Sequence, residues 1–212
     1  MRKLTRAFTG TAATGAAIVA AVALAAAPAF ATVNTATVSG NTNSDGSFSA
    51  TATGPTLTDS KTKVKLTCAS ATASGIAKNG TYTAGAPNAI SVASLTTLKW
   101  NQCTISGIGF SVTANATPWS LNATGATDST GDVTPGSITG VNASLTGACN
   151  ATVTGAVTGT YTNSTHTLAI NAGSLTVSGV SGLCLGLINN GDAVVYNANY
   201  VVTPATLAVN AT

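Results

Sequence analysis

Acid and base groups are scarce in this chain of 212 residues, of which charged residues make up 6%. Glutamate is absent, and His166 is the single histidine. A glycosidase holds two carboxylates across the bond that it cleaves, and a serine hydrolase needs a histidine base. Asp59 with Asp132 or Asp192 would meet the first need only if folding brought them together. We therefore expect no enzyme and assign no catalytic residue.

The first 31 residues have the pattern of a secretion signal. Basic residues open it, the apolar run 16–27 follows, and Ala29-Phe30-Ala31 supplies the small residues that signal peptidase recognises. A membrane-spanning helix needs about 20 apolar residues, and this run is shorter. We expect cleavage after Ala31, a mature chain of residues 32–212, and no stable transmembrane anchor.

Arginine is missing from the mature chain, and its five lysines equal its five aspartates in number. The net positive charge of the whole sequence therefore belongs to the signal segment. A protein that binds nucleic acid needs a basic surface to neutralise phosphates. The composition thus excludes nucleic acid as a partner.

No stretch of the mature chain shows apolar residues at helical spacing. Short runs such as 165–170 instead place apolar side chains at every second position, which is the period of a strand. The dipeptides Asp45-Gly46, Asn79-Gly80 and Asn190-Gly191 favour two-residue hairpin turns. The pattern predicts an all-β protein.

Two parts of the chain, about 44–125 and 126–212, resemble each other at a spacing of about 80 residues. Gly80-Thr81-Tyr82-Thr83 matches Gly159-Thr160-Tyr161-Thr162, and the Ser-Leu-Thr triplet recurs at 94–96 and 174–176. We expect two pseudo-repeats, with both tyrosines in equivalent core positions. They would form one domain, a β-sandwich or partly closed barrel. Two small tandem domains divided within 125–136 are the alternative.

The sequence contains four cysteines, and an exported chain keeps such residues oxidised. Cys103 follows Cys68 at the same distance as Cys184 follows Cys149. A duplication would copy a bridge within one unit, so we predict the disulfides Cys68–Cys103 and Cys149–Cys184. No CxxC pair exists, and one histidine is too few for a zinc site. We expect neither a metal site nor a cofactor.

Two groups of side chains are candidates for contact with a partner. Trp100 and Trp119 would bind ligand if exposed, by stacking on sugar rings, while core packing is the alternative. The alternating Lys61, Lys63 and Lys65 predict one cationic strand face. Such a face protects a sheet edge from unwanted pairing or docks on an anionic polymer.

Several motifs resemble those of small secreted β-rich proteins from actinobacteria, Streptomyces especially. The motifs are Cys149-Asn-Ala-Thr-Val-Thr-Gly, Tyr161-Thr-Asn163, Cys184-Leu-Gly-Leu-Ile-Asn-Asn-Gly-Asp192, and Tyr200 with Pro204. The resemblance spans most of the mature chain. It implies export and a disulfide-braced β fold, and it brings no function and no catalytic residue.

Taken together, these features predict a noncatalytic protein of the cell envelope or extracellular space, with a structural or binding role and an unknown ligand. Its hydroxyl-rich surface would contact cell-wall polymer or other envelope proteins. A module that binds wall polysaccharide through an exposed tryptophan is one alternative. A membrane-associated β-barrel, suggested by the alternation and the positive mean hydropathy, is another.

Overall fold

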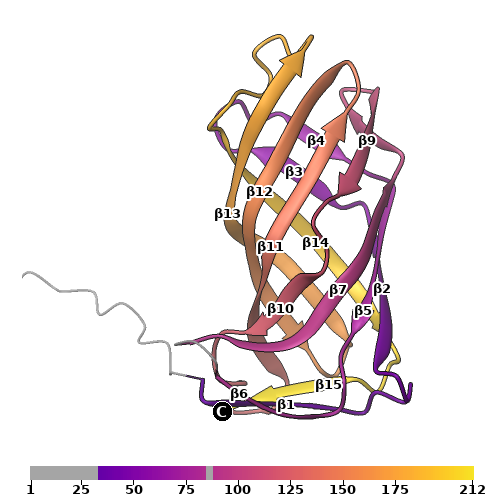
Figure 1. Cartoon of the computed structure of the whole chain (residues 1–212), viewed down its shortest axis with the longest axis vertical. Helices are drawn as coiled ribbons and strands as arrows, with labels where there is room; N and C mark the ends of the chain where they lie inside the picture. The colour runs from indigo at the N-terminus through magenta and orange to yellow at the C-terminus, as the bar shows by residue number, and fades with distance from the viewer. Residues whose placement is uncertain (1–32, 85–87) are drawn as a thin grey trace, which may run out of the picture.

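The computed structural model describes residues 33–84 and 88–212, and in this part every regular element is a β-strand (Figure 1). The expected secretion signal lies outside the described residues. No helix in the described part is long and apolar enough to cross a membrane. The strands are β1 (Thr35–Ser39), β2 (Ser47–Thr53), β3 (Thr56–Asp59), β4 (Lys65–Thr67), β5 (Ser70–Ile76), β6 (Gly80–Thr83), β7 (Ile90–Asn101), β8 (Cys103–Ile105), β9 (Ile108–Ala114), β10 (Trp119–Ala123), β11 (Val133–Thr146), β12 (Cys149–Thr162), β13 (Thr167–Gly182), β14 (Ala193–Thr203) and β15 (Ala208–Ala211).

A twelve-stranded sheet forms most of the molecule, in the order β10-β11-β12-β13-β14-β2-β5-β7-β9-β8-β4-β3. Additional pairings of β10 with β7, β11 with β9 and β14 with β3 bring distant members of this order together. The sheet therefore curls round a common interior as a partly closed barrel. Strands from both halves of the chain contribute to it. The prediction of an all-β fold is confirmed.

Side-chain alternation explains how the curled sheet separates an apolar interior from a polar exterior. In β2, Phe48, Ala50 and Ala52 are buried, while the serines and threonines between them face outward. Successive side chains of a strand point to opposite faces, so this pattern gives one apolar face and one hydroxyl-bearing face. The apolar faces meet in one core.

The two ends of the curled sheet differ in their coverage (Figure 1). At the upper end of Figure 1 lie the connections β3–β4, β8–β9, β11–β12 and β13–β14. At the lower end a three-stranded sheet, β15-β1-β6, lies across the opening. Its Ala36, Val38 and Ala211 are almost fully buried. The small sheet thus closes the lower end with apolar side chains.

The predicted two-residue hairpins are wrong, although all three dipeptides lie in a connection or where a connection meets a strand. Asn79-Gly80 leads from β5 into β6, and β6 pairs with β1 rather than with β5. The Asn79 side chain instead bonds both the N–H and the carbonyl of Asn41. Asn190-Gly191 belongs to the long connection 183–192. The Asn and Asp side chains bond to backbone in wider connections, which the dipeptide alone does not reveal.

The two similar halves agree in one local feature and differ in another, and the structure does not establish two complete repeats. Gly75 pairs with Leu95, and Gly155 pairs with Leu175, as the sequence match requires. However, Tyr82 lies in β6 of the small sheet, whereas Tyr161 lies in β12 of the large one. The expectation of equivalent core positions for these tyrosines is therefore wrong.

Candidate ligand cavity

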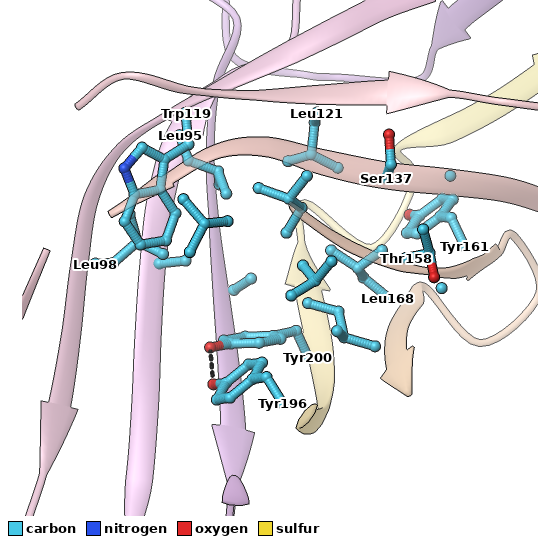
Figure 2. Close-up of a pocket in the computed structure, with 18 of the residues that line it drawn as sticks. Leu95, Leu98, Trp119, Leu121, Ser137, Thr158, Tyr161, Leu168, Tyr196 and Tyr200 are labelled. Atoms are coloured by element: carbon cyan, nitrogen blue, oxygen red, sulfur yellow. Dashed lines mark hydrogen bonds between the residues drawn. The ribbon is translucent and has the colours of Figure 1, made fainter. Parts of the chain in front are cut away.

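An apolar cavity of about 140 Å³ lies inside the curled sheet (Figure 2). Its lining runs from Val38 and Val209, on the small sheet at the lower end, to Leu66 and Leu145 near the upper end. Almost all lining atoms are carbon. Apolar cavities of roughly 150 Å³ stay dry and accept benzene or xenon, so this one is large enough for a small apolar molecule.

Alanines at inward-facing positions explain why the interior is not filled. Ala50, Ala73, Ala123 and Ala143 all line the cavity and are buried, although they come from four different strands. An interior enclosed by about eight strands is just wide enough for larger side chains to fill it. A methyl group at these positions does not reach the centre. The space is therefore a direct consequence of the inward residues.

Both tryptophans border this cavity, and the structure brings them together. Trp100 of β7 and Trp119 of β10 have ring centroids 6.4 Å apart at an interplanar angle of 42°. The Trp119 ring is 3% exposed, and its Nε1 donates to the carbonyl of Asn115 at 3.0 Å. The alternative of core packing is confirmed for Trp119, and the exposed pair that sugar stacking needs is not found. Their assignment as possible ligand-binding residues stays a prediction.

Two tyrosines of β14 form the main polar feature of the cavity wall. The hydroxyls of Tyr196 and Tyr200 are 2.7 Å apart (Figure 2). Trp100 Nε1 donates to Tyr196 Oη at 3.0 Å. Burial raises the pKa of both tyrosines, and that of Tyr200 lies well above its usual value. Both hydroxyls therefore stay protonated at neutral pH.

Counting hydrogens shows that this cluster has one donor to spare. Trp100 brings one N–H, and the two tyrosines bring one O–H each. The indole hydrogen and one hydroxyl hydrogen are used within the cluster. The second hydroxyl hydrogen has no protein acceptor in the described part of the chain. A buried donor without an acceptor is costly, so a ligand oxygen beside it would be favoured.

Sequence reasoning missed this tyrosine pair, although the sequence holds a signal for it. In β14, Val194, Tyr196, Ala198, Tyr200 and Val202 recur at every second position. That spacing places both hydroxyls on the inward face, four residues apart, within one strand. The valine density in this stretch predicted only a strand. What the spacing does not reveal is the partner Trp100, which comes from the opposite half of the chain.

The predicted disulfides Cys68–Cys103 and Cys149–Cys184 are both present. The first joins the chain before β5 to the start of β8, just after β7 ends, and the second joins the start of β12 to the chain after β13. No cysteine in the described residues is free. These bonds fasten neighbouring antiparallel strands near the upper end. Each disulfide therefore braces the upper end covalently.

The polar candidates outside the cavity take part in turns. Asp59 and Asp192 do come together, at the connections of the upper end, and a hydrogen bond with Asn189 chiefly lowers the pKa of Asp192. One oxygen of each accepts backbone N–H groups, while Asp59 Oδ2 is buried without a partner. Among the described residues no three histidine, cysteine or acidic side chains gather as a metal site would require.

His166 lies in the turn between β12 and β13 rather than at the start of the strand run expected for it. Its φ is 51°, a left-handed conformation that suits a turn. Its carbonyl accepts from the N–H of Val202, and its Nδ1 is buried without a hydrogen-bond partner. Within the described residues, no hydrogen bond joins this nitrogen to a carboxylate or to a hydroxyl.

No protein-family model, curated protein or solved structure matches this chain. The features of the molecule that bear on its function are therefore the cavity and the surface.

Proposed function

We propose that this protein is a noncatalytic extracellular binding protein that holds a small apolar molecule inside its curled sheet. The observation that carries the proposal is the apolar cavity of about 140 Å³ bordered by both tryptophans. An unfilled apolar space loses dispersion contacts on every side of its lining, and an apolar ligand restores them. Because the space is already formed, binding requires little ordering of the chain.

The tyrosine pair adds one element of selectivity. Its spare hydroxyl hydrogen lies among carbon atoms and favours a ligand that carries a single acceptor oxygen, such as a ketone or an ether. An added hydrogen bond of this kind contributes about 1 kcal/mol. The proposed ligand is thus apolar with one oxygen, and it is uncharged because the cavity offers no counter-ion.

The compartment follows from two features that agree with each other. Disulfides persist in oxidising surroundings, and both predicted pairs are formed. The sequence pattern of residues 1–31 favours export. The outward faces carry threonine and serine with few charges, so association with envelope polymer remains part of this proposal.

Tryptophan fluorescence tests the proposal, because the chain has two tryptophans and both border the cavity. We expect bromobenzene, whose heavy atom quenches indole on contact, to quench the emission saturably. Ala143→Leu would fill part of the cavity and weaken this quenching. Ala172→Leu is the matched control, since Ala172 is exposed on β13 and outside the lining. Quenching that never saturates would contradict the proposal. So would quenching that is equally strong in the Ala143→Leu and Ala172→Leu variants.

A second titration tests the role of the tyrosines. We expect 4-bromoacetophenone to bind more tightly than bromobenzene, because its carbonyl accepts the spare hydrogen. Replacing both Tyr196 and Tyr200 by phenylalanine should remove this advantage, a change of roughly three- to tenfold. Bromobenzene itself should bind the double variant about as well as the original protein. An advantage that survives in the double variant would show that the tyrosines do not select the ligand.

A further inference from the structure

Large exposed apolar side chains gather at the upper end of the molecule. Leu183, Leu185 and Leu187 are 75%, 85% and 42% exposed, and all three lie in the connection between β13 and β14. Ile108, in the β8–β9 hairpin at the same end of the molecule, is 55% exposed. Elsewhere in the described residues only Val201, on β14, is comparably large and exposed. A concentration of this kind marks a contact surface.

The connection 183–192 holds these leucines in a fixed arrangement. Cys184 is tied to Cys149, and the N–H of Leu183 donates to the carbonyl of Ala148 at 2.9 Å. The carbonyl of Leu187 accepts from Thr62 Oγ1 at 2.8 Å, which joins the connection to the β3–β4 turn. Ile188 is buried beneath it. The leucines are therefore displayed by an anchored segment.

Leu185 combines two features that are unfavourable for a protein surrounded by water. Its side chain is the most exposed of the three, and its backbone has a φ of 50°, in the left-handed region that glycine or asparagine usually occupies. Leucine usually is buried and usually has a negative φ. A residue that departs from both preferences is typical of a functional position. Gly186, with a φ of 72°, follows directly.

Positive charge lies beside these leucines. Lys61 and Lys63 are exposed in the β3–β4 turn, not on a strand as the sequence suggested, and Lys65 begins β4. The two aspartates of this end, Asp59 and Asp192, are buried and bond to turn amides. The exposed charged side chains of this end are therefore lysines, and they lie with exposed leucines.

We infer that the upper end docks on an anionic lipid surface. Leu183, Leu185 and Leu187 enter the boundary between headgroups and acyl chains, and Lys61 and Lys63 lie against lipid phosphates. Apolar residues flanked by lysine bind interfaces in this way, since burial and attraction to anionic headgroups act together. This inference does not depend on ligand binding in the cavity, because different residues carry it.

Cosedimentation of the protein with lipid vesicles tests the inference. We expect binding to phosphatidylglycerol vesicles, much weaker binding to phosphatidylcholine vesicles, and weakening by 0.5 M salt because the electrostatic part is screened. Replacing the three leucines by serine should lower the affinity by about a hundredfold. Val201→Ser is the matched control, since it removes an exposed apolar side chain elsewhere and should change nothing.

A charge variant separates the two parts of the contact. Lys63→Gln should lower the affinity for phosphatidylglycerol about fivefold, and Lys78→Gln, at the opposite end, should leave it unchanged. The absence of vesicle binding, or equal binding by the triple-serine variant, would overturn the inference. Sedimentation velocity gives a further test. If the original protein forms dimers and the triple-serine variant does not, the inference is overturned, because a second copy of the chain would then cover the leucines. Bromobenzene quenching without vesicles reports separately on the cavity.

Discussion

The two ends of the curled sheet use apolar residues in opposite ways. At the lower end, Ala36, Val38 and Ala211 of the small sheet face inward and are almost completely buried. At the upper end, Leu183 and Leu185 are turned outward, while a disulfide and backbone hydrogen bonds hold their segment. The lower end is closed by packing. The upper end is braced covalently, which leaves its apolar side chains free for contact.

Charge follows the same division. Asp45 and Asp128 are exposed at connections of the lower end, with Lys78 beside Asp45, whereas Lys61, Lys63 and Lys65 are exposed at the upper end with the leucines. Hydrogen bonds from the N–H groups of Ser47 and Asp132 respectively lower the pKa of these two aspartates. Although residues 32–212 hold five lysines and five aspartates, three of these lysines are exposed at the upper end. The difference teaches that net charge alone hides a cationic end.

The largest expected effect concerns the disulfides, both of which lie toward the upper end. Each closes a loop of sequence separation 35, so the loop-entropy model predicts that removing either costs roughly 4 kcal/mol. We expect Cys149→Ser with Cys184→Ser, and Cys68→Ser with Cys103→Ser, to lower the free energy of unfolding by similar amounts. Urea denaturation measures both. A negligible loss for Cys149–Cys184 would mean that packing alone holds the upper end.

A smaller effect contrasts the two ends directly. Val38→Ala should cost about 2 kcal/mol, because it deletes two buried methyl groups and leaves a space in the small sheet. Leu185→Ala should change the free energy of unfolding by less than about 0.5 kcal/mol, since its side chain is exposed. The same denaturation experiment gives both values. Equal costs would show that Leu185 stabilises the fold and is not reserved for contact.

How far the sequence predicts this molecule depends on how local each signal is. The all-β fold follows from side-chain alternation, and the disulfides follow from equal cysteine spacing. Both predictions can be made without knowing which strands pair with each other. The sequence indicates Trp100 and Trp119 as candidate residues, but their meeting inside the sheet depends on the pairing of β7 with β10. No local pattern specifies that pairing.

The small sheet shows the same limit more clearly. Its strands come from three distant parts of the chain, and β1 lies between β6 and β15. Turn dipeptides predict neighbours in sequence, so they placed Asn79-Gly80 in a hairpin that does not form. The match of Tyr82 with Tyr161 failed for the same reason. Identical short motifs entered different sheets because pairing partners far along the chain decided their place.

The smallest expected effect lies at the lower end and depends on pH. Tyr161 donates to the carbonyl of Leu207 at 2.8 Å, and burial raises its pKa to about 12. The unfolded chain loses this proton near pH 10, while the folded protein keeps it. The contribution of the protonated Tyr161 to the free energy of unfolding is therefore complete below pH 10 and is lost as the pH rises toward 12. Tyr161→Phe should cost about 1 kcal/mol at pH 7 and less at pH 12. A constant difference from pH 7 to 12 would contradict this role.

The account as a whole depends on an interior that is formed, apolar and able to accept a guest. Diffraction from crystals held under xenon gas measures this most directly, because xenon enters dry apolar cavities and scatters strongly. We predict a xenon site inside the curled sheet, bordered by Trp119 and Tyr200. An interior filled with ordered water, or side chains collapsed into the space so that xenon finds no site, would contradict the account.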